Sequence, residues 1–234
     1  LSQGKRFERE AAEMTELPTQ ADAINLQFST ITPLPSTKRV VTLKQMYLKV
    51  GERTLAKNIN FELLGQEKIG IIGENGVGKS TFIKELRNLL QKKKGITLGY
   101  MPQIYPDSLN EVDSPIDFLT STGEAIEREK ILTHLASLQF TRNEVQHSIS
   151  QLSGGQKAKL LLLKMVLDQA NVLLLDEPTR NFSPTSQPQV RKLFTDYSGA
   201  IITVSHDRTF LKEVCQKIYR LTETGLEPVR NEQP

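Results

Sequence analysis

The feature that most constrains the fold of this chain is a glycine-rich run at 73–80, Gly-Glu-Asn-Gly-Val-Gly-Lys-Ser. The apolar residues 68–72 before it predict a short strand, and residues 79–90 predict a helix behind it. In this spacing the glycines let backbone N–H groups approach phosphate oxygens, and the helix N-terminus adds its dipole. A glycine turn that arose by chance would not require a strand before it and a helix after it. The run therefore predicts a phosphate-binding loop.

The side chains of this loop have different expected contacts with a nucleotide. We expect Lys79 to reach the β- and γ-phosphates, the Ser80 hydroxyl to ligate Mg²⁺, and Thr81 to assist the α-phosphate. The residues expected to bind the nucleotide are Gly73, Glu74, Asn75, Gly76, Val77, Gly78, Lys79, Ser80 and Thr81. ATP and Mg²⁺ are therefore the predicted cofactors.

Two carboxylates follow a second apolar run. Residues 172–175 read Val-Leu-Leu-Leu, which is typical of a strand buried on both faces, and Asp176 and Glu177 come at its C-terminal end. Open α/β sheets bind ligands at that edge. We expect Asp176 to hold Mg²⁺ through water, and Glu177 to polarise the attacking water as a general base. Taken alone, the pair fits an ordinary acidic turn before Pro178 equally well.

Strand and helix patterns alternate along most of the chain. Further strands are expected at 40–49, 54–63, 96–100, 200–204 and 217–221, and helices from Ser114-Pro115 and at 124–138, 154–168, 185–197 and 207–214. This order predicts an α/β fold. Its expected parts are a mixed sheet with parallel central strands, an antiparallel β flank and a small helical subdomain at about 104–151.

The first 38 residues have a different pattern. Mixed charges and helix formers at 5–14 predict the end of an exposed helix, which Pro18 stops. Ile24, Leu26 and Phe28 alternate with polar residues, which predicts an edge strand. We therefore divide the chain into a leading segment, 1–38, and one domain, 39–234.

Composition limits the class of protein. Hydrophobic residues at 38% and charged residues at 24% permit a packed core, and a net charge of +3 is too small to imply nucleic-acid binding. The sequence contains no run of about 20 apolar residues, which predicts a cytoplasmic protein. The single cysteine, Cys215, excludes an internal disulfide, and its apolar helical neighbourhood predicts a buried, inert thiol.

The segment 152–156, Leu-Ser-Gly-Gly-Gln, gives the most specific signal. Ser153 is a good N-cap, and the two glycines after it leave a helix N-terminus open to close approach of an anion. A capped helix explains this segment alone. It does not explain the order of the motifs, which is phosphate loop, Gln103, this segment, carboxylate pair and His206. In that order, over about residues 40–222, the sequence resembles the ATP-binding cassette (ABC) family.

The resemblance implies further roles. Gln103 matches the glutamine that touches Mg²⁺ and the attacking water, and His206 matches the histidine that contacts the γ-phosphate. The implied catalytic residues are Gln103, Glu177 and His206, the implied metal ligands are Ser80, Gln103 and Asp176, and the implied contacts to the ATP of an opposite cassette are Ser153, Gly154, Gly155 and Gln156. The implied active unit is a head-to-tail pair with a second cassette, in the same chain or in a homodimer, so one domain alone is expected to hydrolyse ATP poorly.

Two sequence segments, 176–179 and 204–211, most closely resemble those of the ABC-F branch, whose members carry two fused cassettes and act on the ribosome. By this resemblance the chain is the second cassette, and residues 1–38 are the tail of the inter-cassette linker and an edge strand. The alternative is the nucleotide-binding subunit of a membrane transporter, which needs a groove in 104–151 for its membrane subunit. A third candidate is a nucleotide-gated binding module with slow turnover.

Interaction with a ribosome requires exposed basic surface for rRNA phosphates, and binding should weaken with salt. Lys92-Lys-Lys94 fits this requirement, although a solvated turn is its simpler interpretation.

The chain departs from the family pattern at two places. Val50 stands where cassettes usually place an aromatic that stacks on adenine, and Tyr47 lies three residues away. After 176–179 the family commonly shows Asn-His-Leu-Asp, whereas this chain reads Arg-Asn-Phe-Ser, so Ser183 cannot supply the carboxylate that helps couple two ATP sites. We therefore expect weak base discrimination and unequal ATP sites.

Overall fold

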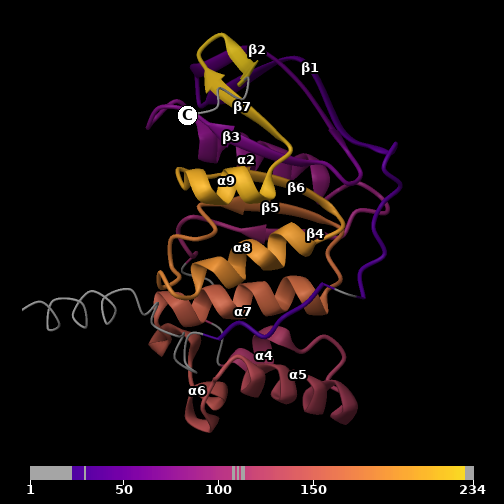
Figure 1. Cartoon of the computed structure of the whole chain (residues 1–234), viewed down its shortest axis with the longest axis vertical. Coiled ribbons are helices and arrows are strands. Elements are labelled where there is room, and N and C mark those ends of the chain that lie inside the picture. The colour runs from indigo at the N-terminus through magenta and orange to yellow at the C-terminus, as the bar shows by residue number, and fades with distance from the viewer. Residues whose placement is uncertain (1–22, 29, 107–108, 110, 112–113, 230–234) are drawn as a thin grey trace, which may run out of the picture.

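The computed structural model describes residues 23–28, 30–106, 109, 111 and 114–229. The helix expected at 5–14 lies outside these residues. Within them, the strands form one six-stranded sheet and one two-stranded sheet. No described helix is both long and apolar enough to cross a membrane. Figure 1 shows the two sheets at one end and a group of short helices at the other.

The six-stranded sheet has the order β4-β5-β6-β3-β7-β8. Its strands are β3 (Lys68–Ile72), β4 (Leu98–Met101), β5 (Val172–Asp176), β6 (Ala200–Val204), β7 (Lys217–Thr222) and β8 (Gly225–Pro228). The first five are parallel, and β8 pairs antiparallel with β7. Every residue of β5 and β6 is buried, as expected for strands covered on both faces. The α/β fold class is therefore confirmed.

Successive side chains of β5 enter two different hydrophobic cores. Leu174 belongs to the α2 core, the apolar cluster between this sheet, α2 (Lys79–Leu90) and the antiparallel pair β1 (Arg39–Val50) and β2 (Arg53–Leu64). Leu173 and Leu175 belong to the α7 core, the cluster on the opposite face of the sheet. Successive side chains of a strand point to opposite faces of the sheet, and this alternation assigns them to different cores.

Helices cover the α7 face of the sheet and continue beyond it. Those packed on the sheet are α7 (Gly154–Leu167), α8 (Gln187–Asp196) and α9 (Arg208–Val214). Beyond α7 lie α4 (Pro115–Leu119), α5 (Ala125–Ser137), α6 (Arg142–Gln146) and the short 3₁₀ turn η2 (Ile149–Gln151) (Figure 1). Ser114 caps α4, and Thr141 and Glu144 form a capping box on α6. These short helices fall in the region where a helical subdomain was expected.

An extended segment, which we call the strap (residues 23–28 and 30–35), runs across α7 and up one side of the molecule to β1 (Figure 1). The predicted edge strand at 24–28 is wrong, because these residues pair with no strand in the described part of the chain. Ile24, Leu26 and Phe28 are nevertheless buried, and all three belong to the α7 core. The alternation in sequence therefore reflects packing on helices rather than on a sheet.

Other differences from the expected elements are small. The strand expected at 96–100 is β4 at Leu98–Met101, and β8 was not expected. Cys215 lies just after α9 beside Gly70, and burial raises the pKa of its thiol to about 12, which agrees with an inert thiol.

Candidate nucleotide site

A cavity of about 260 Å³ lies at the C-terminal ends of β3, β5 and β6. Its lining residues are Leu55, Asn75, Gly76, Gly78, Lys79, Ser80, Thr81, Gln103, Asp176, Glu177 and His206. Residues far apart in sequence thus meet at the edge of the sheet where parallel α/β folds bind ligands. Leu55 is the one lining residue that sequence reasoning missed, because an apolar strand residue has no chemical signal of its own.

The phosphate loop is held tightly against the β1–β2 hairpin. Gly78, just before α2, has a left-handed φ of 111°, and a Cβ there would lie 2.9 Å from Cδ1 of Leu55 and 3.0 Å from Cδ2 of Leu48. A side chain at this position is therefore excluded by both backbone conformation and space. Lys79 Nζ donates hydrogen bonds of 2.7 Å to the carbonyl oxygens of Gly73 and Glu74, so the loop folds around its own lysine.

Burial changes the charge balance at the bottom of the cavity. It raises the pKa of the Asp176 carboxyl, against a hydrogen bond from Ser80 and the charge of Lys79. It also lowers the pKa of Lys79, against the charges of Glu177 and Asp176. Two carboxylates and one ammonium share this enclosed site, which is therefore suited to hold further positive charge.

The oxygen donors fit a magnesium ion. A hydroxyl (Ser80), a carboxylate (Asp176) and a side-chain amide (Gln103) line the same cavity. Mg²⁺ is typically held by one or two carboxylates, substrate phosphates and water rather than by a full cage of protein ligands. Among the described residues no group of three or more His, Cys, Asp or Glu side chains forms such a cage. The residues present therefore suit Mg²⁺ in its nucleotide complex.

Glu177 is both strained and incompletely paired. Its φ is 52°, in the left-handed region that a non-glycine residue rarely adopts, while its N–H donates to the Val204 carbonyl at 2.8 Å. The His206 N–H donates to Glu177 Oε2 at 3.3 Å. Glu177 Oε1 is buried without a hydrogen-bond partner among the described residues, and His206 Nε2 lies 3.6 Å from it.

Burial raises the pKa of Glu177, against a hydrogen bond from the His206 backbone. A buried carboxylate with a free acceptor oxygen and a raised pKa is suited to accept a proton from water. His206 itself is largely exposed at the mouth of the site.

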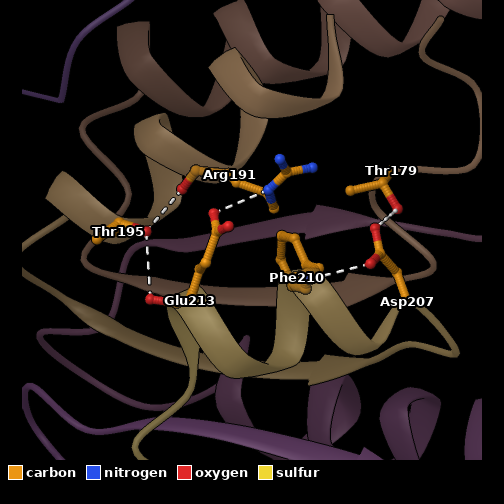
Figure 2. A network of polar contacts seen from close by, with 6 residues as sticks. All are labelled: Thr179, Arg191, Thr195, Asp207, Phe210 and Glu213. Atoms are coloured by element: carbon orange, nitrogen blue, oxygen red, sulfur yellow. Dashed lines mark hydrogen bonds and ion pairs between the residues drawn. The ribbon is translucent and has the colours of Figure 1, made fainter. Parts of the chain in front are cut away.

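A network of polar contacts fixes the two segments that carry Glu177 and His206 (Figure 2). Thr179 Oγ1 donates to Asp207 Oδ2 at 3.1 Å, and Asp207 Oδ1 accepts from the Phe210 N–H at 3.0 Å as the N-cap of α9. Farther along, the Arg191 guanidinium of α8 pairs with Glu213 of α9 at 2.8 Å. The segment after β5 and the segment after β6 are thus joined directly beyond Glu177 and His206.

The segment expected to meet an opposite cassette lies apart from the cavity. Ser153, Gly154, Gly155 and Gln156 do not line it. Ser153 and Gln156 form a capping box at the N-terminus of α7, in which Ser153 Oγ accepts from the Gln156 N–H at 3.2 Å. Gly154 is exposed, so the open N-terminus of α7 faces outward. Val50 and Tyr47 are also exposed, and neither lines the cavity.

The parallel sheet, the glycine loop before α2 and the acidic pair at the end of β5 define a P-loop nucleotide-binding domain. Residues 56–180 match the ABC transporter family, and this chain belongs to that family of ATPase domains.

The curated relatives include members of the ABC-F branch. The chain is 30% identical over 224 residues to the probable ATP-binding protein YheS of Escherichia coli K12, covering 92% of this chain and 35% of YheS. It is 30% identical over 239 residues to the ribosome protection protein VmlR of Bacillus subtilis, covering 100% of this chain and 43% of VmlR. It is 28% identical over 231 residues to ABC transporter F family member 2 of Arabidopsis thaliana, covering 95% of this chain and 34% of that protein. The chain thus spans well under half the length of these relatives.

Solved structures agree on the fold. A post-hydrolysis dimer of the ATP-binding cassette MJ0796, bound to ADP and phosphate, superposes with a TM-score of 0.65 at 18% identity, covering 81% of this chain and 99% of that one. A second dimeric structure of MJ0796, described as a bacterial ABC transporter cassette, gives a TM-score of 0.64 at 19% identity, with the same two coverages of 81% and 99%. At this identity the likeness extends to the fold alone.

Proposed function

We propose that this chain is an ATP-binding and ATP-hydrolysing cassette, the second of an ABC-F type protein that acts on the ribosome in the cytoplasm. The observation that carries the proposal is the cavity in which Lys79, Asp176, Glu177 and His206 meet. Support for the ABC-F branch comes from relatives such as YheS and VmlR. The name of VmlR, a ribosome protection protein, motivates the ribosome as partner.

The proposed reaction is hydrolysis of ATP to ADP and phosphate. Lys79 exchanges its two carbonyl partners for β- and γ-phosphate oxygens, and the loop N–H groups bind the remaining phosphate oxygens. Glu177 accepts the proton of the attacking water at Oε1, its free oxygen. His206 positions Glu177 through its backbone N–H and contacts the γ-phosphate with its ring. When bound, Mg²⁺ neutralises charge on the β- and γ-phosphates, and Ser80, Asp176 and Gln103 would hold it.

The proposed active unit is a head-to-tail pair of cassettes. The exposed N-terminus of α7, with Ser153 to Gln156, lies outside this chain's own cavity and is free to meet the ATP of an opposite cassette. The dimeric likeness to MJ0796 motivates a pair. The second cassette belongs to the same full-length chain, or to a second copy when this domain is isolated, and one domain alone is a weak ATPase. Because Ser183 provides no carboxylate, the two ATP sites are proposed to be unequal.

Replacing the proposed base tests this mechanism. In the complete protein, Glu177→Gln should lower phosphate release at this site at least about 100-fold, because a general base contributes roughly that factor or more. ATP should still bind and remain trapped in a closed pair, as measured by retention of labelled ATP after rapid gel filtration. Lys79→Ala is the matched control, which should bind no ATP. Normal phosphate release from the Glu177→Gln protein would remove Glu177 from the base role.

The trapped protein also distinguishes the possible partners. We expect Glu177→Gln protein with ATP to sediment with ribosomes, and the bound fraction to fall as salt rises, because contacts to rRNA phosphates release counterions. A stable complex with a membrane subunit would instead support the transporter alternative.

A further inference from the structure

A side-chain hydrogen bond joins two loops that lie far apart in the sequence. Asn181 Nδ2, in the segment after the carboxylate pair, donates to Tyr105 Oη at 2.8 Å across 76 residues of sequence. Tyr105 lies two residues after Gln103, which lines the nucleotide cavity. The bond therefore connects the loop that carries Gln103 to the loop that follows Glu177.

The same asparagine also packs against the start of α7. Its Oδ1 lies 3.4 Å from the place that a Cβ on Gly154 would occupy, and its carbonyl oxygen lies 3.1 Å from the corresponding place on Gly155. These glycines lack side chains, so nothing separates Asn181 from the backbone of the capping-box segment. Asn181 thus lies between Tyr105 on one side and the N-terminus of α7 on the other.

The bond is partly shielded from water. Tyr105 packs against the α7 core, and burial raises the pKa of its hydroxyl to about 12, although the bond from Asn181 opposes this shift. The hydroxyl is consequently neutral at physiological pH and accepts from the amide. A hydrogen bond in such surroundings is stronger than the same bond in water.

We propose that the Tyr105–Asn181 bond is a positioning contact, which transmits the state of this cassette's nucleotide site to the α7 segment offered to the opposite cassette. A shift of Gln103 on nucleotide binding moves Tyr105, Tyr105 moves Asn181, and Asn181 moves Gly154 and Gly155. Neither residue lines the cavity, so both act through their neighbours. This inference rests on the proposed two-cassette function.

The experiment uses the complete protein in a trapping background, with Glu177→Gln and the matching substitution in the other cassette. Tyr105→Phe, Asn181→Ala and the double variant are compared for the rate at which trapped labelled ATP escapes. The affinity of this cassette's own cavity for Mg·ATP is measured in parallel. Each single variant should release trapped ATP about fivefold faster, the effect of losing one hydrogen bond. The double variant should be no faster than either single one, because both changes break the same contact.

Tyr197→Phe is the matched structural control. Its hydroxyl donates to the Ala170 carbonyl at 2.9 Å within the same α7 core, away from the loops. We expect this control to leave the escape rate unchanged, and all variants to keep Mg·ATP affinity at the cavity within twofold. If ATP is trapped but Tyr105→Phe behaves like Tyr197→Phe, or the two single effects add, the positioning role is wrong. If the background protein traps no ATP at all, the proposed function fails, and this inference falls with it.

Discussion

At the scale of single residues, Glu177 has two features that lower the stability of the folded domain. Glu177 has a left-handed backbone and a buried carboxylate oxygen with no hydrogen-bond partner in the described structure. Both features cost free energy in the folded state. They persist because β5, β6 and the Thr179–Asp207 contact hold the surrounding segments. The same two features leave an acceptor available for water.

Removing the charge of Glu177 should stabilise the nucleotide-free domain. Because burial raises its folded-state pKa, the folded state binds the proton more tightly than the unfolded state does. The ionised group therefore destabilises the fold fully at pH values above the raised pKa, and this penalty disappears as pH falls below about 4.5, the ordinary glutamate value.

We expect Glu177→Gln to raise Tm at pH 8 by roughly 2–4 °C, since relieving an unpaired buried group is worth about 1 kcal/mol. The gain should shrink at pH 5. Thermal melts of both proteins, with the exposed Glu52→Gln as control, measure it. An equal rise in Tm for both variants, or a rise that does not depend on pH, would contradict a destabilising buried charge at Glu177.

Ser183 offers a substitution that the local structure can accept. Its hydroxyl accepts from the Ser186 N–H at 3.2 Å, in the turn that leads into α8. Aspartate forms the same kind of local side-chain-to-backbone bond in turns. We therefore expect Ser183→Asp to keep the fold and to raise ATP turnover of the complete two-cassette protein about fivefold, which corresponds to the lower end of typical coupling energies. Steady-state phosphate release measures this, and unchanged turnover in a normally folded variant would refute the unequal-site hypothesis.

At the scale of elements, the strap joins the two hydrophobic cores. Ile24 and Phe28 lie in the α7 core, and Leu34 lies in the α2 core. The ring of Phe28 meets that of Tyr197 edge-on, with centroids 4.8 Å apart. At the far end, Gln66 Nε2 donates to the Leu34 carbonyl at 2.9 Å. The strap therefore contributes to the packing of the domain although it has no regular structure.

Truncating the strap's aromatic anchor should cost stability. Phe28→Ala removes a buried ring, and such changes typically cost about 3–5 kcal/mol. Gln27→Ala, at the exposed neighbouring position, should change the free energy of unfolding by less than about 0.5 kcal/mol. Urea denaturation of the two variants gives both values. A cost for Phe28→Ala as small as that of the control would mean that the strap is not part of the cooperative fold.

Sequence patterns predicted the elements that carry strong local signals. The glycine spacing ahead of Lys79 and the two carboxylates after an apolar strand were sufficient to locate most of the cavity. The strap was misread because Ile24, Leu26 and Phe28 show the same alternation whether an extended chain lies on helices or joins a sheet. The Tyr105–Asn181 bond left no trace in sequence, since its partners lie 76 residues apart and each is an ordinary loop residue.

At the scale of the whole molecule, the nucleotide should act as part of the fold. Ligands of the native state stabilise it by mass action, by about 2.7 kcal/mol at 100 times Kd. For a domain of this length that corresponds to a rise in Tm of roughly 5–10 °C. The rise should appear with Mg·ATP and vanish in Lys79→Ala, as measured by differential scanning fluorimetry. If Mg·ATP left the Tm of the native domain unchanged, this result would contradict nucleotide binding despite the family match.

The strap also has a mechanical consequence. One end is tied to α8, where Gln189 Oε1 accepts from the Ile24 N–H at 2.8 Å, and the other is pinned at the turn between β2 and β3. A force on the strap at Ile24 would thus act on α8, the helix that follows the Ser183 turn. A displacement of the strap would therefore shift α8 together with the loop that joins it to the acidic pair at the end of β5.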